Sequence, residues 1–431
     1  MDLDAIVLAD GALAGVTIAG LRARDRAERV ARRIGAARIL VVDNVVDDDR
    51  GAIAAWRAGR TCPVLLIRAD QLVHTPLVAP LVAALPANGL AIAVGPDDAY
   101  AGALLAAGDS VGRVIERLAR GDGDDAIAAT ADARVPHGEI ARHPIATREQ
   151  RRAAHELLYR ILIKPQDNAI TRYLFRPISS RMSRVLVQTP ITATQVSMVV
   201  AVLVALGCWL TLDPRPSRLI AGALTILVAS YFDCCDGEIA RVKLQSSTFG
   251  AWLDTIVDEL SSIGYMVALG WHCHAYYGAS YFGELGFDPW LAGLWIGLAT
   301  YGWSLFAVYY NIIVGVGSAN SQDYASRFVV VAGASAGSVR LVPKPPGPAR
   351  DLPRWLTPIV AFLPNLVRRD FIVWIAAAYA VLDVPHVSFA THIAGGVVSS
   401  VVVAIDHVML RRARRDATRD GKRLEPPRRK A

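Results

Sequence analysis

Short apolar runs alternate with amphipathic, arginine-rich stretches over the first third of the chain. Four of the runs have the length of a β-strand: Ala5–Ala9, Arg38–Val42, Val64–Ile67 and Leu90–Val94. The stretches between them repeat apolar residues with the period of an α-helix: Arg24–Ile34, Gly51–Ala58 and Leu77–Ala84. Strands that alternate with helices are typical of a largely parallel sheet covered by helices. The pattern therefore predicts a small α/β domain over residues 1–150.

A basic stretch with helical spacing begins at Arg151. Its arginines lie among aromatic and aliphatic side chains: Arg172, Arg176, Arg181 and Arg184 with Tyr173, Leu174, Phe175 and Ile178. Such a stretch next to an apolar span is typical of a helix that lies at the membrane surface. An ordinary linker helix is the alternative. We interpret residues 151–190 as a juxtamembrane amphipathic helix and linker.

Six long apolar segments follow, over residues 192–211, 217–232, 249–272, 289–316, 371–385 and 388–410. Several of them reach the roughly 20 residues that a helix needs to cross the hydrocarbon core, and two, 217–232 and 371–385, are shorter. Six spans place both ends of the chain on the same side of the membrane. The sequence thus predicts a multidomain protein, with an all-α, six-helix transmembrane domain over residues 191–410 behind the α/β domain.

Basic residues predict the orientation of these spans, because cytoplasmic loops carry an excess of Lys and Arg. The loops expected inside hold Arg241, Lys243, Arg327, Arg340, Lys344, Arg350, Arg354, Arg368 and Arg369. The outer loop over residues 273–288 holds none, although the other outer loop holds Arg215 and Arg218. The first ten residues are acidic and lack a basic n-region, which predicts no cleaved signal peptide. We expect a multi-pass protein of the cell membrane with both termini and the α/β domain in the cytoplasm.

Composition and charge add two constraints. A chain with 53% hydrophobic and 20% charged residues and a mean hydropathy of +0.34 is neither disordered nor collagen-like. The net charge of +7 could point to nucleic acid, but ten Lys and Arg against three acids lie in the tail, residues 411–431. Directly after an apolar span, that tail is better interpreted as an anchor near anionic lipid, and we expect no nucleic-acid partner. The five cysteines match neither a zinc spacing nor a disulfide framework.

The candidate chemistry lies in one acidic stretch of the membrane part, YFDCCDGEIARVKLQSSTFGAWLDTIVDEL. Asp233 and Asp236 are three residues apart and Asp254 and Asp258 four apart, so each pair shares a helix face. A carboxylate inside a membrane is costly unless it is paired, hydrated or bound to metal. Four close carboxylates need cations, and hard oxygen ligands suit one or two Mg²⁺ or Mn²⁺ ions. Such ions indicate a phosphate substrate.

Small and basic residues between the acids support that interpretation. Gly237, Ala240 and Gly250 leave room for close helix contact and a bulky ligand. Arg241, at the cytoplasmic boundary, can neutralise a diphosphate. The pattern predicts a dimetal phosphate site at the cytoplasmic interface. A solvated acidic loop and the cation or proton pathway of a transporter are the alternatives.

These positions match the signature DxxDGxxARx(8)GxxxDxxxD, in which the chain resembles the CDP-alcohol phosphotransferase (phosphatidyltransferase) family. The resemblance implies an integral membrane enzyme that moves a substituted phosphate from a CDP-alcohol donor to an acceptor hydroxyl, with release of CMP, in phospholipid or inositol-phosphate-type biosynthesis. It implies two Mg²⁺ or Mn²⁺ ions on Asp233, Asp236, Asp254 and Asp258, with Asp258 also the general base. Gly237, Ala240, Arg241 and Gly250 would contact the cytidine diphosphate, and the family also implies a homodimer in membrane lipid.

The chain departs from the family before the first span. Relatives often read Thr-Pro-Asn-x-x-Thr there, whereas this chain has Thr194 in place of the asparagine, so nucleotide contacts from this helix are open. For the acceptor, Arg368 and Arg369 resemble a basic position of relatives whose acceptor carries a phosphate. Lys164 and Arg172 are further acceptor candidates. The alternative is that all four are positive-inside anchors.

Residues 1–130 distantly resemble nucleotidyltransferases, as in fused inositol-phosphate cytidylyltransferase and di-inositol-phosphate synthase proteins, where one half makes a CDP-alcohol and the other consumes it. Ala5–Gly11 would be the opening strand and turn, and Ile67–Asp70 the strand that leads to a metal-binding acid. Ala12–Gly15 lacks the glycine and arginine pattern that wraps a nucleoside triphosphate. We expect a degenerate domain that binds, regulates or dimerises. A bifunctional enzyme with an active front half, and a non-catalytic cation-binding transporter or scaffold, are the alternatives for the whole chain.

Overall fold

The protein is described by a computed structural model that covers residues 2–43, 49–84, 87–163, 167, 169–317, 324–333, 335, 337–344, 368–419 and 423–425. The chain divides into two compact units. The first unit comprises Met1–Asp167, Arg176–Ala193 and Cys235–Ser246, and the second comprises Asn168–Phe175, Thr194–Cys234 and Ser247–Ala431. One helix, α9 (Pro216–Val242), therefore contributes its last turns to the first unit and the rest to the second.

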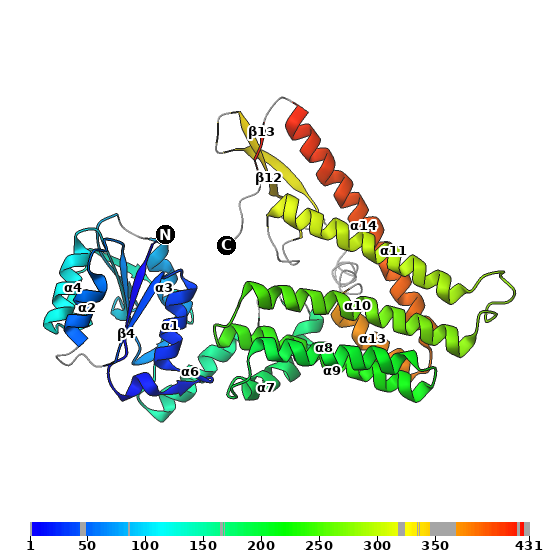
Figure 1. Cartoon of the computed structure of the whole chain (residues 1–431), viewed down its shortest axis with the longest axis horizontal. Helices are drawn as coiled ribbons and strands as arrows, with labels where there is room; N and C mark the ends of the chain where they lie inside the picture. Colours follow the sequence, from blue (N-terminus) through cyan, green and yellow to red (C-terminus); the bar gives the residue numbers. More distant parts are fainter. Residues whose placement is uncertain are drawn as a thin grey trace, which may run out of the picture. The chain divides into compact units, whose positions relative to one another are not determined.

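The first unit is built on a six-stranded sheet of order β4-β1-β5-β8-β7-β9. Its strands are β1 (Asp4–Leu8), β4 (Arg38–Val42), β5 (Val64–Arg68), β7 (Gly89–Val94), β8 (Tyr100–Ala107) and β9 (Ala133–Pro136). Its helices are α1 (Ala23–Arg33), α2 (Asp49–Arg57), α3 (Thr75–Ala83), α4 (Ser110–Arg120) and α5 (Asp124–Ala128). The four predicted strands and the three predicted helices are all present, and the predicted α/β architecture is confirmed (Figure 1).

Both faces of this sheet are buried. Successive side chains of a strand point to opposite faces, and Val7 and Ile6 of β1 accordingly join two different apolar clusters. The cluster of Val7 includes Val30 of α1 and Leu77 of α3, whereas the cluster of Ile6 includes residues of α2 and α4. Helices thus cover each face (Figure 1). Burial on both faces explains why the strands are continuous apolar runs instead of alternating patterns.

The sheet is mixed, not largely parallel. β1 pairs in parallel with β4 and β5, and β7 with β9, but β8 runs antiparallel to both β5 and β7. The sequence pattern missed β8 because its residues, YAGALLAA, include glycine and alanines, which have weak strand propensity. Burial between two strands and two helix layers holds small apolar residues there all the same.

Two helices and several short elements complete the first unit and the segment behind it. The stretch expected as one juxtamembrane helix holds α6 (Arg148–Tyr159), which begins with a Thr147–Gln150 capping box, and α7 (Arg176–Leu186). The short elements are η1 (Ala12–Gly15), β2 (Thr17–Ile18), β3 (Leu21–Arg22), β6 (Gln71–Val73), β10 (Arg142–Pro144), η2 (Arg160–Leu162) and the π-helical η3 (Thr171–Phe175).

The second unit is mainly helical. Besides α9, its helices are α8 (Ala193–Leu212), α10 (Thr248–Tyr277), α11 (Pro289–Tyr310), the π-helical η4 (Asn311–Val316), α13 (Arg369–Val381) and α14 (Pro385–Arg419). The six predicted apolar segments overlap these helices: 289–316 covers both α11 and η4, and 371–385 runs past the end of α13. A small sheet of β11 (Phe328–Ala332), β12 (Ser338–Pro343) and β13 (Arg423–Leu424) was not predicted.

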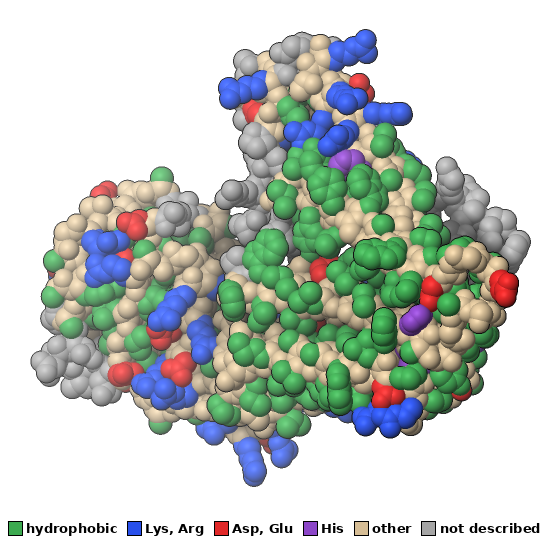
Figure 2. Space-filling model, turned by 45° about the vertical axis from the view of Figure 1, so that its right-hand side comes forward, with side chains coloured by type: hydrophobic (Ala, Val, Ile, Leu, Met, Phe, Trp, Pro, Cys, Tyr) green, Lys and Arg blue, Asp and Glu red, His purple; other side chains and the backbone are tan. Residues whose placement is uncertain are grey.

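Four helices among the described residues are long and apolar enough to cross a membrane. They are Ala193–Leu212, Pro216–Val242, Pro289–Val316 and Pro385–Arg419. α10 carries three acids in its first half, and α13 has only 13 residues, fewer than the roughly 20 of a span. Large apolar side chains gather on the outside of the helical part (Figure 2). Trp295 is 73% exposed and Val202 68%. Such a surface is typical of helices that face lipid.

Candidate metal centre

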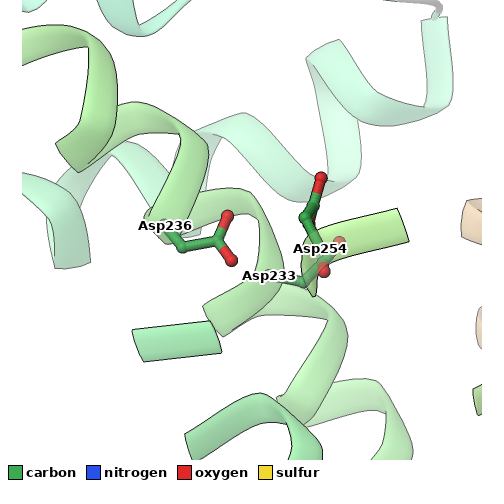
Figure 3. Close-up of side chains that lie close together, drawn as sticks. All are labelled: Asp233, Asp236 and Asp254. Carbon is green, nitrogen blue, oxygen red and sulfur yellow. The ribbon is translucent and has the colours of Figure 1, made fainter. Parts of the chain in front are cut away.

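Three carboxylates from two helices come together in the structure. Asp233, Asp236 and Asp254 each offer one oxygen, and these oxygens lie within 4.8 Å of one another (Figure 3). Asp233 and Asp236 share a face of α9, because they are three residues apart, and Asp254 lies on α10. Three carboxylates this close repel one another unless a cation lies between them. Their oxygens are the ligands that Mg²⁺ and Mn²⁺ prefer, so this donor set fits such an ion.

A guanidinium already neutralises part of this acidic cluster. Arg369, in the first turn of α13, lies with Nη2 2.5 Å from Oδ2 of Asp233, and its Nη1 contacts Oδ1 of Asp258. Asp258 lies one helical turn after Asp254 on α10. Arg369 therefore joins the fourth acid of the signature to the first. Positive charge on α13 thus stabilises carboxylates from two other helices, α9 and α10.

Asp233 and Asp258 border a cavity of about 370 Å³ in the second unit. Charged, hydroxyl and apolar side chains line it together. The charged lining residues are Asp233, Asp258, Glu259 and Arg369, and the hydroxyl ones are Ser230, Ser261, Ser262, Tyr265, Tyr301, Ser304 and Ser399. A cavity that combines an apolar wall with a few convergent polar groups is the usual form of a small-molecule site.

The signature positions, Asp233 to Asp258, lie in a segment that matches a protein-family model. Residues 190–296 match the model of the family "CDP-alcohol phosphatidyltransferase". The chain carries a CDP-alcohol phosphatidyltransferase domain. The first-span helix α8, the acidic stretch and the start of α11 all lie in the matched part.

Curated relatives share part of the sequence. Proteins named "Bifunctional IPC transferase and DIPP synthase" are 30% identical over 146 residues in Aquifex aeolicus, 32% over 128 in Thermococcus kodakarensis and 35% over 115 in Rubrobacter xylanophilus. These stretches cover 32%, 30% and 27% of this chain. The chain spans about a third of the length of the curated relatives it matches, or less: 32%, 28% and 26%.

One polar group of the phosphatidyltransferase domain was missed by the sequence analysis. Glu259 lines the cavity next to Asp258 and accepts hydrogen bonds from the hydroxyl groups of Tyr301 and Tyr309. The two tyrosines are eight residues apart on α11, about two turns, and so share a face. An acid directly after Asp258 and this tyrosine spacing were the signals that could have found the group.

A buried hydroxyl also faces the cavity. Tyr265 lines it, is only 5% exposed, and its hydroxyl has no hydrogen-bond partner among the described residues. A buried polar group without a partner costs about 1–3 kcal/mol. A ligand with hydroxyl groups would remove that cost by occupying the cavity.

The predicted cytidine-contacting residues lie along α9 and at the starts of α8 and α10. Arg241 donates from Nε to the carbonyl of Ile161 (3.3 Å) and from Nη2 to that of Leu162 (3.2 Å). A methyl group on Gly237 would approach Nη1 of Arg241 to 3.3 Å, so the glycine leaves room beside the guanidinium. Ala240, which lies between these two residues in the sequence, is half-buried. These roles in nucleotide binding stay predictions.

The two remaining cytidine candidates begin helices. Gly250 donates its N–H to Oγ of Ser247 at 2.9 Å, and this N-cap fixes the start of α10 one turn before Asp254. Thr194 lies half-buried in the first turn of α8. Their contacts with a nucleotide likewise stay predictions.

Of the four acceptor candidates, the structure brings Arg369 to the acids. Arg368 is exposed at the N-cap of α13, and Arg172 is exposed on η3. Lys164 lies outside the described residues. Asp370, next to Arg369, accepts a 2.6 Å hydrogen bond from the hydroxyl of Thr171, which ties η3 to α13.

The acid proposed for the front domain has a different environment. β5 leads to Asp70 as predicted, but the Asp70 carboxylate accepts hydrogen bonds from Nε (3.2 Å) and Nη2 (2.6 Å) of Arg68. Arg68 also contacts Asp125 at 3.1 Å and lies 3.8 Å from Asp124. The hydrogen bond with Asp70 raises the pKa of Arg68 above its usual value. Asp70 is thus the partner of an arginine.

Proposed function

We propose that this chain is an integral membrane CDP-alcohol phosphotransferase. It transfers a substituted phosphate from a CDP-alcohol to the hydroxyl group of an acceptor and releases CMP. The observation that carries the proposal is the meeting of Asp233, Asp236 and Asp254 from two helices of the matched domain. Two Mg²⁺ or Mn²⁺ ions would bind there, and when bound they polarise the diphosphate and stabilise the departing CMP.

The other residues of the site have separate roles in the transfer. Asp258, beside the cluster and on the cavity, takes the proton of the acceptor hydroxyl as its oxygen attacks phosphorus. The bond from that phosphorus to the bridging oxygen breaks, and the electron pair leaves with CMP. Arg241 and the small residues Gly237 and Ala240 hold the cytidine diphosphate. Arg369 neutralises phosphate charge beside Asp233 and Asp258.

The alcohol carried by the CDP-alcohol donor is of the inositol-phosphate type. The relatives that support this are named for IPC transferase and DIPP synthase, and the hydroxyl-lined cavity with Glu259 and Tyr265 suits a polyhydroxyl group. Arg369 is the cation that an acceptor phosphate would meet. A phospholipid headgroup linkage is the other product class that the same chemistry allows.

The membrane arrangement extends the four candidate spans. α10 and α13 complete six transmembrane helices over residues 191–410, with both termini in the cytoplasm of a cell-membrane protein that forms a homodimer. Residues 1–150 form the cytoplasmic α/β domain, residues 151–190 the juxtamembrane segment, and residues 411–431 the basic tail. The excess of basic residues in the loops expected inside supports this orientation. Acids within a membrane-spanning helix usually mark a functional site, so the acids of α10 are compatible with α10 as a span.

A second candidate is a bifunctional enzyme whose front domain also makes the CDP-alcohol. The relatives' printed name, "Bifunctional", favours it. The pairing of Asp70 with Arg68 favours a degenerate front domain instead. Diphosphate release from CTP and an alcohol phosphate by the full-length protein would support the bifunctional enzyme. No diphosphate release with inositol, glycerol or sugar phosphates would count against it.

CMP release tests the main proposal. Purified protein in detergent or lipid, with Mn²⁺ or Mg²⁺, is offered a grid of CDP-alcohols against inositol phosphate, glycerol phosphate, serine and inositol. We expect metal-dependent CMP release for one pair, its loss in Asp258→Asn, and no change in Glu284→Gln, an exposed acid of the loop after α10. Folded protein that binds Mn²⁺ but releases no CMP with any pair would contradict the proposal and favour a transporter or scaffold.

A further inference from the structure

Helix α1 of the front domain directs a row of arginines at the end of α9. Arg26, Arg29 and Arg33 are three and four residues apart and so follow one helix face. Arg26 has no exposed surface; it donates from Nη1 to the carbonyl of Val242 (2.8 Å) and from Nη2 to that of Ile18 (3.2 Å). Val242 is the last residue of α9. The hydrogen bond joins residues 216 positions apart in the chain.

The neighbouring arginines continue the same contact. Arg29 donates to the carbonyl of Lys243 at 2.8 Å, and Arg33 to the hydroxyl of Ser246 at 3.3 Å. The ammonium group of Lys243 turns the other way and donates to the carbonyls of Thr189 (2.6 Å) and Ile191 (2.8 Å). Three arginines of α1 therefore bond to residues 242–246 at and just after the end of α9, and Lys243 ties the same turn to residues 189–191.

Two physical effects make this end a natural place for cations. The last carbonyls of an α-helix have no partner within the helix, and the helix dipole puts partial negative charge there. Burial, with the charge of Arg29, lowers the pKa of Arg26 to about 9. A guanidinium with that pKa is still protonated at neutral pH, so carbonyls that accept its hydrogen bonds offset its loss of hydration.

Close packing also holds the end of α9 against the front domain. Leu244, in the left-handed conformation with φ of 54°, turns the chain after α9 and joins the core cluster that contains Val30 of α1. Gly20, with φ of 74°, lies close to the residue after α9: a Cβ at this position would approach Cε of Lys243 to 3.1 Å and the carbonyl oxygen of Val187 to 1.9 Å. The end of α9 is therefore built into the first unit.

We propose that the front domain positions α9, with Arg26 and Arg29 as positioning residues for the metal-binding acids of that helix. The inference rests on the proposed function only in that Asp233 and Asp236 bind the ions. Asp236 is six residues, about 9 Å along a stiff helix, from Val242. Fixing the end of α9 fixes where the carboxylate lies. The α/β domain supports phosphoryl transfer in this way without a catalytic residue of its own.

The test compares three arginines of α1 in the full-length protein. Arg26→Met and Arg29→Met remove the bonds to α9, whereas Arg32→Met removes an exposed arginine that pairs with Glu28 on the same helix. Mn²⁺ affinity is measured by titration without nucleotide, and CMP release is measured against Mn²⁺ concentration. We expect Arg29→Met to weaken Mn²⁺ binding about tenfold and Arg26→Met by more, with Arg32→Met unchanged.

Two features separate positioning from general instability. Excess Mn²⁺ should return CMP release of Arg29→Met close to the wild-type maximum, because the acids are displaced and not lost; misfolding would lower the maximum without changing the Mn²⁺ dependence. Arg26→Lys should restore part of the affinity that Arg26→Met loses. If Arg26→Met does not fold, the half-buried Arg29 carries the test.

The inference is overturned if folded Arg26→Met and Arg29→Met bind Mn²⁺ as the wild type does. That outcome is distinct from failure of the proposed function. A wild-type protein that releases no CMP would remove the reaction, and the comparison of Mn²⁺ affinities would still decide whether α1 positions the acids.

Discussion

Each unit of the molecule gathers acids around one arginine, yet the two clusters differ in kind. In the first unit, Arg68 pairs with Asp70 two residues away and with Asp125, whose side chain is 72% exposed. In the second, Arg369 lies between acids of two other helices, and the side chain of Asp233 is 15% exposed on a cavity. Water reaches Asp125 of the first cluster, although the side chain of Asp124 is only 11% exposed, whereas Asp233 and Asp258 of the second line a cavity among apolar helices. The cavity and its apolar setting, more than the number of carboxylates, favour the second cluster as a ligand site.

The largest effect should come from the second cluster. Asp233→Asn removes a metal ligand, and we expect CMP release to fall about a thousandfold, which corresponds to about 4 kcal/mol of lost transition-state stabilisation. Mn²⁺ titration and CMP release measure it. Equal turnover in the wild type and in folded Asp233→Asn would mean that the acids are not the metal centre.

Acid pH should weaken the first unit through His74. Burial, with the charges of Arg26 and Arg33, lowers the pKa of His74 from 6.5 to about 4. Between these values the unfolded chain binds a proton that the folded chain does not, so stability is lost as pH falls from 6.5 to 4. The loss should reach about 3 kcal/mol, at 1.36 kcal/mol per pKa unit.

Urea unfolding of the full-length protein between pH 7 and pH 4 measures this loss. The variant His74→Gln cannot take up the proton, and its stability should change less over that interval. An unchanged pH dependence in the folded variant would show that another group is responsible.

Removing Arg369 should unbalance the second cluster. Without metal, Arg369→Met leaves carboxylates without their cation, and we expect the free energy of unfolding to fall by about 1–3 kcal/mol. Mn²⁺ should bind more tightly than in the wild type, because no guanidinium competes for Asp233 and Asp258. Thermal unfolding with EDTA and with Mn²⁺ measures both effects, and Arg327→Met, an exposed arginine of the same unit, is the control. Weaker Mn²⁺ binding in Arg369→Met would contradict the competition.

The cavity hydroxyl should have a smaller effect. Tyr265→Phe removes a hydroxyl group that has no hydrogen-bond partner in the described part of the chain, so stability without ligand should not fall. If a polyhydroxyl substrate bonds to it, KM should rise about fivefold, close to 1 kcal/mol, with kcat little changed. Tyr281→Phe, in the exposed loop after α10, is the matched control. An unchanged KM would place the alcohol elsewhere in the cavity.

The smallest effect is expected at Asp70. Asp70→Asn breaks a half-exposed ion pair with Arg68, which is worth at most about 1 kcal/mol. CMP release should be unchanged, and so should any nucleotide transfer by the front domain if that domain is degenerate. A loss of diphosphate release from CTP in this variant would instead restore Asp70 as a catalytic acid.

Local pattern accounts for what could be predicted. Strands such as Arg38–Val42 and helices such as Ala23–Arg33 follow from the period of apolar residues, and the spacing of Asp233 and Asp236 places both on one helix face. Strand β8 was not predicted, because its alanines and glycine do not form a clear apolar or alternating pattern. The contacts of Arg26 could not be found this way, since its partner on α9 lies far along the chain.

The same limit applies at the site. Arg369 was expected to meet an acceptor phosphate, and its contacts with Asp233 and Asp258 depend on how three helices pack. Glu259 looks like any acid beside Asp258 until α11 supplies two tyrosines. Sequence spacing identifies groups on one element, whereas groups from several elements need the fold.

The arginine contacts at the end of α9 also bear on how such a gene can change. A deletion that removed the front domain would leave the carbonyls of Val242 and Lys243 without their donors and would expose Leu244. The shortened protein would lose stability in its membrane half as soon as the deletion arose. A front domain without chemistry of its own would therefore still be kept by purifying selection on its neighbour.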